Sequence, residues 1–254
     1  MTMTETTTNR TGVLKLWVLN FVANATALAV WYFWLLIPDA HRWQVVASGV
    51  VALLTIFLVL WLRAGTLSWF RVSEFRGTPE IGRAYRHSLR YILALGFWLL
   101  LFLVIAWLIW GLREYVPQFA VWIRQKFPAA PPIRNITNDA NWTILLIVGY
   151  ILPCLWLPIA TTVAASGVHP THLARSRRVW RRGQYWLWMA LILGVGLYLP
   201  YKLVWWIPNL QTIRQQAFSM GARFLLAYVI AITAFLFAVW ITGVYTESDD
   251  PLNL

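Results

Sequence analysis

The chain has 254 residues, of which 60% are hydrophobic and only 12% are charged. Soluble domains carry about 25% charged residues, so this composition excludes an ordinary soluble domain and equally a disordered chain. The formal net charge of +12 could indicate a nucleic-acid partner in a soluble protein. In a membrane protein, arginines facing anionic headgroups explain it, and we expect no nucleic-acid partner.

Six apolar runs along the chain are each long enough to cross about 30 Å of hydrocarbon as a helix. They cover residues 13–37, 43–62, 91–112, 143–165, 185–207 and 222–245. None of them contains Asp or Glu, and their few cations lie near an end. The sequence therefore predicts an all-α polytopic membrane protein, with 1–254 forming a single integral membrane domain.

Two connecting segments have the pattern of helices that lie on a membrane surface. The first starts near Pro79, places Ile81, Tyr85 and Leu89 on one face, and leads directly into the third span. The second starts at Pro117 and is stopped by proline at 128. The stretch from Asn135 to Thr143 is rich in Asn, Asp and Thr, which favours a turn.

The basic residues predict how the protein is oriented, because cytoplasmic loops keep Lys and Arg near span ends. The loops after the second and fourth spans, together with the start of the chain, contain 13 of the 21 basic residues. We therefore predict that both termini lie in the cytoplasm and that the protein resides in the inner (plasma) membrane.

The chain contains an apparent internal repeat, with units at 43–127 and 143–218. Each unit consists of a span, a basic segment preceded by proline (Pro79 or Pro170), a second span, and an outer segment that begins with proline. The outer segments begin at Pro117 and Pro208 and each continue to an Ile-Arg-Gln triplet. A duplication with both copies in the same orientation is typical of some membrane proteins.

Two groups of arginines on the cytoplasmic side are candidates for binding lipid headgroups or other anions, because each basic residue at an anionic surface contributes about 1 kcal/mol. Membrane lipids are therefore expected partners. The candidate residues are Arg83, Arg86, Arg90, Arg177, Arg178, Arg181 and Arg182.

Polar residues and prolines inside the spans suggest a possible pathway through the protein. Asn20 and Asn24 lie four residues apart and so share one face of the first span. Buried amides most often hydrogen-bond a neighbouring helix. Pro153 and Pro158 free backbone carbonyls and kink the fourth span, and broken helices line binding sites in transporters.

His169 and His172 are weak candidates for a metal site in the loop after the fourth span. Pro170 disfavours a helical conformation at His169, and no third ligand lies nearby in the sequence, although zinc needs at least three protein ligands. We predict no metal site and no cofactor.

The sequence FRGTPEI at 75–81, followed by RAYR at 83–86 and a span, resembles the inner-loop signature of a group of bacterial six-helix membrane proteins. This group includes YciC-like proteins and the membrane domain of some glycerophosphodiester phosphodiesterases. The resemblance implies a helical bundle with basic inner helices and carries over no catalytic residues. The second repeat has Gly-Val-His-Pro at 167–170 in place of the Arg-Gly-x-Pro phrase.

Three classes of function are compatible with the sequence. The favoured class is a non-enzymatic membrane component that packs against lipid or another membrane protein. The second is a small carrier or flippase-like protein for an anionic lipid or metabolite, which would use the kinked fourth span. The third is a membrane-embedded enzyme at the cytoplasmic interface that would use His169, His172 and a carboxylate.

Overall fold

The computed structural model describes residues 3–37, 41–71, 80–208 and 212–247, and this part of the chain is almost entirely helical, with no strand. Six of its helical stretches are long and apolar enough to cross a membrane, which confirms the predicted all-α polytopic class. They are α1 (Met3–Leu35), α2 (Arg42–Trp69), α3 and α4 (Ile81–Ser88, Ile92–Gly111), α6 and α7 (Ile133–Leu146, Leu152–Ser166), α9 and α10 (Gly183–Leu193, Leu199–Trp205), and α11 (Ile213–Glu247).

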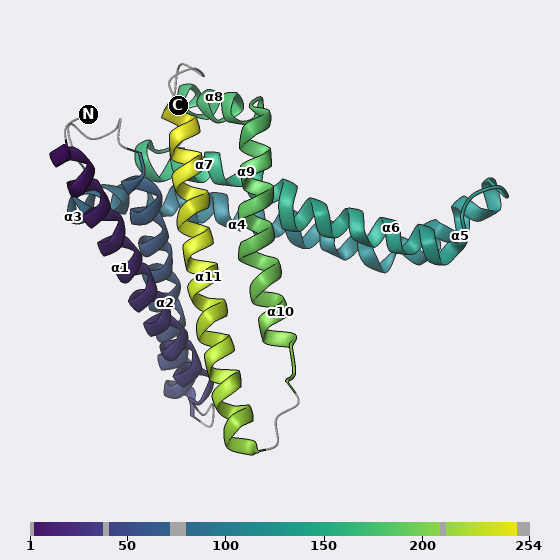
Figure 1. Cartoon of the computed structure of the whole chain (residues 1–254), viewed down its shortest axis with the longest axis horizontal. Coiled ribbons are helices and arrows are strands. Elements are labelled where there is room, and N and C mark those ends of the chain that lie inside the picture. Colours follow the sequence, from purple (N-terminus) through teal and green to yellow (C-terminus); the bar gives the residue numbers. More distant parts are fainter. Residues whose placement is uncertain (1–2, 38–40, 72–79, 209–211, 248–254) are drawn as a thin grey trace.

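The long helices form two groups that extend in different directions (Figure 1). In the first group, which we call the bundle, α1, α2, α9–α10 and α11 run side by side. In the second, which we call the arm, α4 and α6–α7 lie against each other and lead away from the bundle, with α5 (Val116–Lys126) at the far end. If the bundle crosses a flat membrane at right angles, the helices of the arm therefore cannot cross it at the same angle.

Two short helices lie where the arm and the bundle meet, and both carry exposed arginines. The helix α3 continues through a 3₁₀ turn into α4, as expected for the segment that leads into the third span. Its exposed face carries Arg83 and Arg86, whereas Tyr85 on the opposite face is buried. The helix α8 (Pro170–Trp180) connects α7 to α9. The predicted start of α3 near Pro79 lies outside the described residues.

The packed core of the protein lies at this junction. On α2, most of the buried residues fall between Leu62 and Trp69, and on α7 they fall between Cys154 and Ala165. The second span was predicted to end at Leu62, but α2 continues for two further turns into the core. Away from the junction, the helices expose large apolar side chains along most of their length.

The outer segments agree with the predictions in one place and differ in another. The helix predicted from Pro117 is confirmed as α5, which ends at Lys126 just before the prolines, and its place on a membrane surface remains a prediction. The turn predicted from Asn135 to Thr143 is wrong, because these residues belong to α6. Packing of α6 against α5 and α4 overrides their weak helix propensity, and the Thr143 hydroxyl donates to the Asp139 carbonyl within the helix.

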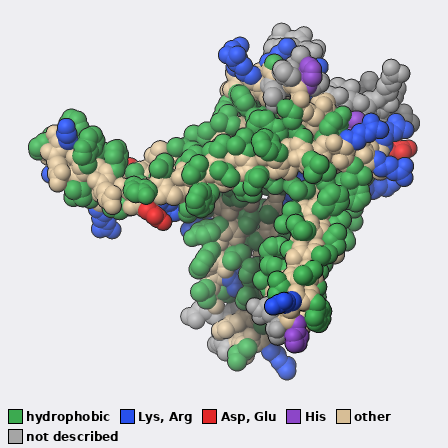
Figure 2. Space-filling view, turned by 180° about the vertical axis from the view of Figure 1, so that it is seen from behind, with side chains coloured by type: hydrophobic (Ala, Val, Ile, Leu, Met, Phe, Trp, Pro, Cys, Tyr) green, Lys and Arg blue, Asp and Glu red, His purple; other side chains and the backbone are tan. Residues whose placement is uncertain are grey.

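The surface seen in Figure 2 is dominated by apolar side chains along both the arm and the bundle, while Lys and Arg gather towards the ends of the helices. This distribution is typical of helices that cross hydrocarbon and end at a polar interface. The order of a long helix, a short basic helix and a second long helix occurs twice, in α2–α4 and in α6–α9. The internal duplication at 43–127 and 143–218 remains a prediction.

Candidate functional site

A cluster of polar side chains lies inside the bundle, between α1, α2 and α3. Its centre is Thr66, whose hydroxyl lies 3.0 Å from the Tyr85 hydroxyl and 3.1 Å from the Asn20 amide nitrogen. Asn20 and Thr66 are fully buried. Each also bonds a carbonyl one turn earlier on its own helix, at Leu16 and Leu62 respectively. The cluster, which we call the inner polar cluster, therefore ties three helices together through satisfied hydrogen bonds.

The inner polar cluster includes a cation that sequence reasoning placed in a loop. Arg63 lies within α2, and its guanidinium donates to the Asn24 side-chain oxygen at 2.8 Å. The same guanidinium lies 4.4 Å from the centre of the Phe235 ring on α11. Arg63 thereby links α1, α2 and α11 through a charge-assisted hydrogen bond and a cation–π contact.

Arg63 lies within the continuous helix α2, one residue beyond the predicted end of the second span at Leu62. It contacts Phe235 of α11, and α2 continues past it into the packed core. The signal in the sequence was Asn20 and Asn24 on one face of the first span, with a basic residue directly after the second.

Replacing Asn24 by leucine is expected to lower the free energy of unfolding by about 2 kcal/mol, because hydrogen bonds to charged groups contribute about 1.5–3 kcal/mol. In an Arg63→Met background the same replacement should cost less than half as much, since the charge is gone. The measurement is a double-mutant cycle of thermal unfolding in detergent. Equal costs in the two backgrounds would show that Asn24 does not stabilise Arg63.

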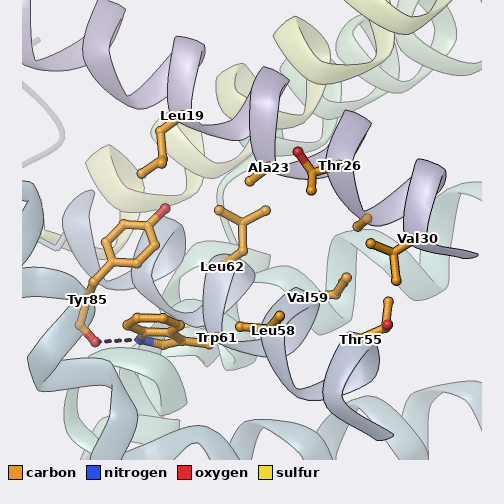
Figure 3. Close-up of a pocket in the computed structure, with 11 residues that line it drawn as sticks. Leu19, Ala23, Thr26, Val30, Thr55, Leu58, Val59, Trp61, Leu62 and Tyr85 are labelled. Carbon is orange, nitrogen blue, oxygen red and sulfur yellow. Dashed lines mark hydrogen bonds between the residues drawn. The ribbon is translucent and has the colours of Figure 1, made fainter. Parts of the chain in front are cut away.

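An apolar pocket of about 350 Å³ lies beside the inner polar cluster, between α1 and α2 (Figure 3). Tyr85 closes one end of it, and the indole of Trp61 donates to the Tyr85 carbonyl at 2.9 Å. The hydroxyls of Thr26 and Thr55 bond carbonyls of their own helices. The pocket therefore offers hydrocarbon surface to a ligand. Its lining is Leu19, Ala23, Thr26, Ala27, Val30, Thr55, Leu58, Val59, Trp61, Leu62 and Tyr85.

The two prolines of the fourth span lie at an irregular part of the α6–α7 helix. A π-helical turn at Ile147–Ile151 directly precedes Pro153. Pro158 cannot donate to the Cys154 carbonyl, and the Tyr185 hydroxyl of α9 donates to that oxygen at 2.9 Å. The Pro158 carbonyl accepts from Thr161, Thr162 and, across the helix interface, Ser176 of α8. The bonds from Tyr185 and Ser176 join α7 to α9 and α8.

The four residues of the predicted pathway fall into two places. Asn20 and Asn24 share the inner polar cluster, where the Asn24 amide donates to the Asn20 carbonyl at 2.6 Å. Pro158 belongs to the junction of α7 with α8 and α9, and Pro153 follows the π-helical turn. None of the four lines the apolar pocket between α1 and α2.

The predicted headgroup-binding arginines lie at the surface of the junction. On the α3 side, Arg83, Arg86 and Arg90 are exposed, and on the α8 side, Arg177, Arg178 and Arg181 are exposed. Arg182 is half-buried, with its guanidinium 5.6 Å from the centre of the Tyr245 ring. Arg71, counted among the loop arginines, is instead fully buried and donates to the Thr162 hydroxyl at 3.2 Å.

Among the described residues, no group of three His, Cys, Asp or Glu side chains is placed to hold a metal ion. His169 is exposed just before α8, and the side chain of His172 lies outside the described part. At Gly167, the end of α7 adopts a positive φ of 76°, a conformation that glycine takes without steric cost.

Sequence reasoning missed a short motif that marks both irregular spans. The sequences VGYILP at 148–153 and VGLYLP at 195–200 each coincide with a π-helical turn that ends two residues before the proline. A proline leaves the carbonyl four residues earlier without its helical donor. The recurrence of Val-Gly with the glycine four residues before the proline was a readable signal of a local irregularity.

The fold and these contacts define the class as an all-α protein, with six helices of membrane-spanning length in the described part of the chain. No family model, no curated protein and no solved structure matches the chain.

Proposed function

We propose that this protein is a non-enzymatic component of the inner membrane that packs against another membrane protein through its arm. The observation that carries the proposal is the exposure of α4. Its large apolar side chains are exposed at three consecutive positions, Leu103, Val104 and Ile105, which point in three directions 100° apart. A helix that is apolar all round requires an apolar environment on every side.

The arm also carries the kind of side chains that stabilise contacts between proteins. Phe97 and Trp107 on α4 and Trp142 on α6 are 63%, 73% and 69% exposed. Large aromatic residues dominate the binding energy of many interfaces. The polar side chains of the bundle, by contrast, are largely used to join its own helices, as in the inner polar cluster. This supports a structural role for the bundle and a binding role for the arm.

We further propose that both termini lie in the cytoplasm and that the exposed arginines of α3 and α8 contact lipid phosphates. The start of α1 and the end of α11 lie at the same end of the bundle, and α8 lies there too (Figure 1). The resemblance to YciC-like six-helix proteins would fit this arrangement and remains a prediction.

Site-specific photocrosslinking tests the role of the arm. With benzoylphenylalanine at Phe97 or Trp107, we expect a discrete protein adduct in native membranes. The adduct should be absent with the same probe at Trp43, which is 67% exposed on the bundle. Once the partner has been identified by mass spectrometry, the two purified proteins should reproduce the adduct. Crosslinks to lipid alone, or only within the chain to α9–α11, would contradict the proposal.

A carrier for an anionic lipid or metabolite is the second candidate. The observation that favours it is the pair of π-helical turns, Ile147–Ile151 and Gly194–Tyr198, in two spans of the same protein. Such turns occur frequently at functional sites, and irregular helices line the binding sites of transporters. In this reading, the kinked fourth span would line the pathway.

A further inference from the structure

A groove of about 680 Å³ lies between α9 and α11, separate from the inner polar cluster. Ile192, Ile241 and Tyr245 are buried and form its floor. Its walls are exposed apolar side chains, and the lining on the α9 side is Leu187, Trp188 and Leu191, facing Phe237 and Trp240 on α11. The groove is thus apolar and lies on the surface of the bundle.

The length of the groove along α9 is close to the thickness of one leaflet of a membrane. It extends along α9 from Gln184 to Ile192, which is about 12 Å at 1.5 Å per residue. Half of a hydrocarbon core is about 15 Å. Gly183, at the upper end, is the first residue of α9, and α8 lies next to this end (Figure 1).

The upper end of the groove is positively charged. Arg181 and Arg182 directly precede α9, and the Arg182 guanidinium lies over Tyr245 of the groove floor. The Tyr245 hydroxyl donates to the Gln184 side-chain oxygen at 3.3 Å, which joins the two helices at the mouth. The groove is apolar, about as long as one leaflet is thick, and has cations at one end. It therefore complements a lipid with an acyl chain and an anionic headgroup.

We propose that the α9–α11 groove binds one anionic phospholipid, with an acyl chain along the groove and the phosphate at Arg181 and Arg182. The proposal extends to Arg181 and Arg182, which follow α8, the headgroup contacts proposed above for the arginines of α3 and α8, and it is independent of any partner of the arm. The charge at the mouth selects an anionic lipid, and the apolar walls select a lipid over a free anion.

Native mass spectrometry of the detergent-purified full chain tests the proposal, with dioleoyl phosphatidylglycerol or dioleoyl phosphatidylcholine added. We expect one phosphatidylglycerol molecule to be retained under conditions that remove phosphatidylcholine. Arg181→Gln with Arg182→Gln should weaken phosphatidylglycerol retention by about 30-fold, from about 1 kcal/mol per arginine at 1.4 kcal/mol per tenfold. Leu191→Trp, which fills the groove, should weaken the retention of both lipids.

Two matched variants serve as controls. Arg134→Gln removes an exposed arginine of α6 on the arm, and Leu100→Trp adds the same bulk to an exposed position on the arm. Neither should change lipid retention. If the double arginine variant retains phosphatidylglycerol normally, the proposal is overturned. Displacement of the lipid by millimolar inorganic phosphate would overturn it in favour of a free-anion site. A loss of lipid without a loss of arm crosslinks would leave the function proposed for the arm intact.

Discussion

Replacing Gly65 by valine is expected to lower the free energy of unfolding by about 3 kcal/mol. A Cβ atom at this position would lie 2.5 Å from two ring carbons of Tyr85. The ring would have to move, which breaks its hydrogen bond to Thr66. Overpacking a core costs about 1–3 kcal/mol, and the lost hydrogen bond adds about 1 kcal/mol. Gly65 therefore allows α2 and α3 to approach closely enough to form the inner polar cluster.

The measurement is the thermal unfolding midpoint in detergent, followed by the fluorescence of the tryptophans. Gly49→Val is the matched control, because Gly49 lies on the same helix and a Cβ there meets no atom within 4 Å. We expect Gly65→Val to lower the midpoint by roughly 10 °C and Gly49→Val to leave it nearly unchanged. Equal shifts for the two variants would show that only the β-branched side chain matters, and not the contact with Tyr85.

Replacing Tyr185 by phenylalanine is expected to cost about 2 kcal/mol. Its hydroxyl donates to the Cys154 carbonyl at 2.9 Å, and Pro158 removes the backbone donor that would otherwise bond this oxygen. Both Tyr185 and Cys154 are fully buried, so the carbonyl would lose its partner in an apolar environment, which costs about 1–3 kcal/mol. Tyr198→Phe, at an exposed position of the same span, is the control and should cost little.

Combining this change with Pro158→Ala tests the physical reason directly. Alanine restores a backbone N–H that can donate to Cys154, so the hydroxyl of Tyr185 becomes less important. In the Pro158→Ala background, Tyr185→Phe should then cost less than about 1 kcal/mol. The difference between the two costs, obtained from a double-mutant cycle, measures the coupling. If Tyr185→Phe costs the same in both backgrounds, the hydroxyl does not replace the donor that proline removes.

Several elements were predictable because their signals are local. The six apolar spans follow from composition and length alone. The helix α5 follows from a proline at its start and prolines after its end. The positive φ at Gly167 follows from a glycine at the end of a helix. Each of these depends on residues that are neighbours in the sequence.

Other features were misread because they depend on residues far apart in the sequence. Arg63 was placed in a loop, since a cation after an apolar run usually marks the end of a span. It remains in α2 because Asn24, 39 residues earlier, and Phe235 provide a hydrogen bond and an aromatic face. Arg71 is buried against Thr162 for the same kind of reason. The polar stretch at 135–143 is helical because α5 and α4 pack against it.

The residues of each segment suffice to predict a set of apolar helices joined by basic connections, because membrane solvation acts on each segment separately. The three-dimensional packing was needed to see which ends of the helices pack together, that α4 and α6 leave the bundle as an arm, and that an apolar groove with arginines at one end lies between α9 and α11. Apolar helices in a membrane have no hydrophobic preference for one another over lipid, so their arrangement depends on close packing and on a few hydrogen bonds. Those contacts, such as Asn20 with Thr66 and Tyr185 with Cys154, join positions that no local pattern connects.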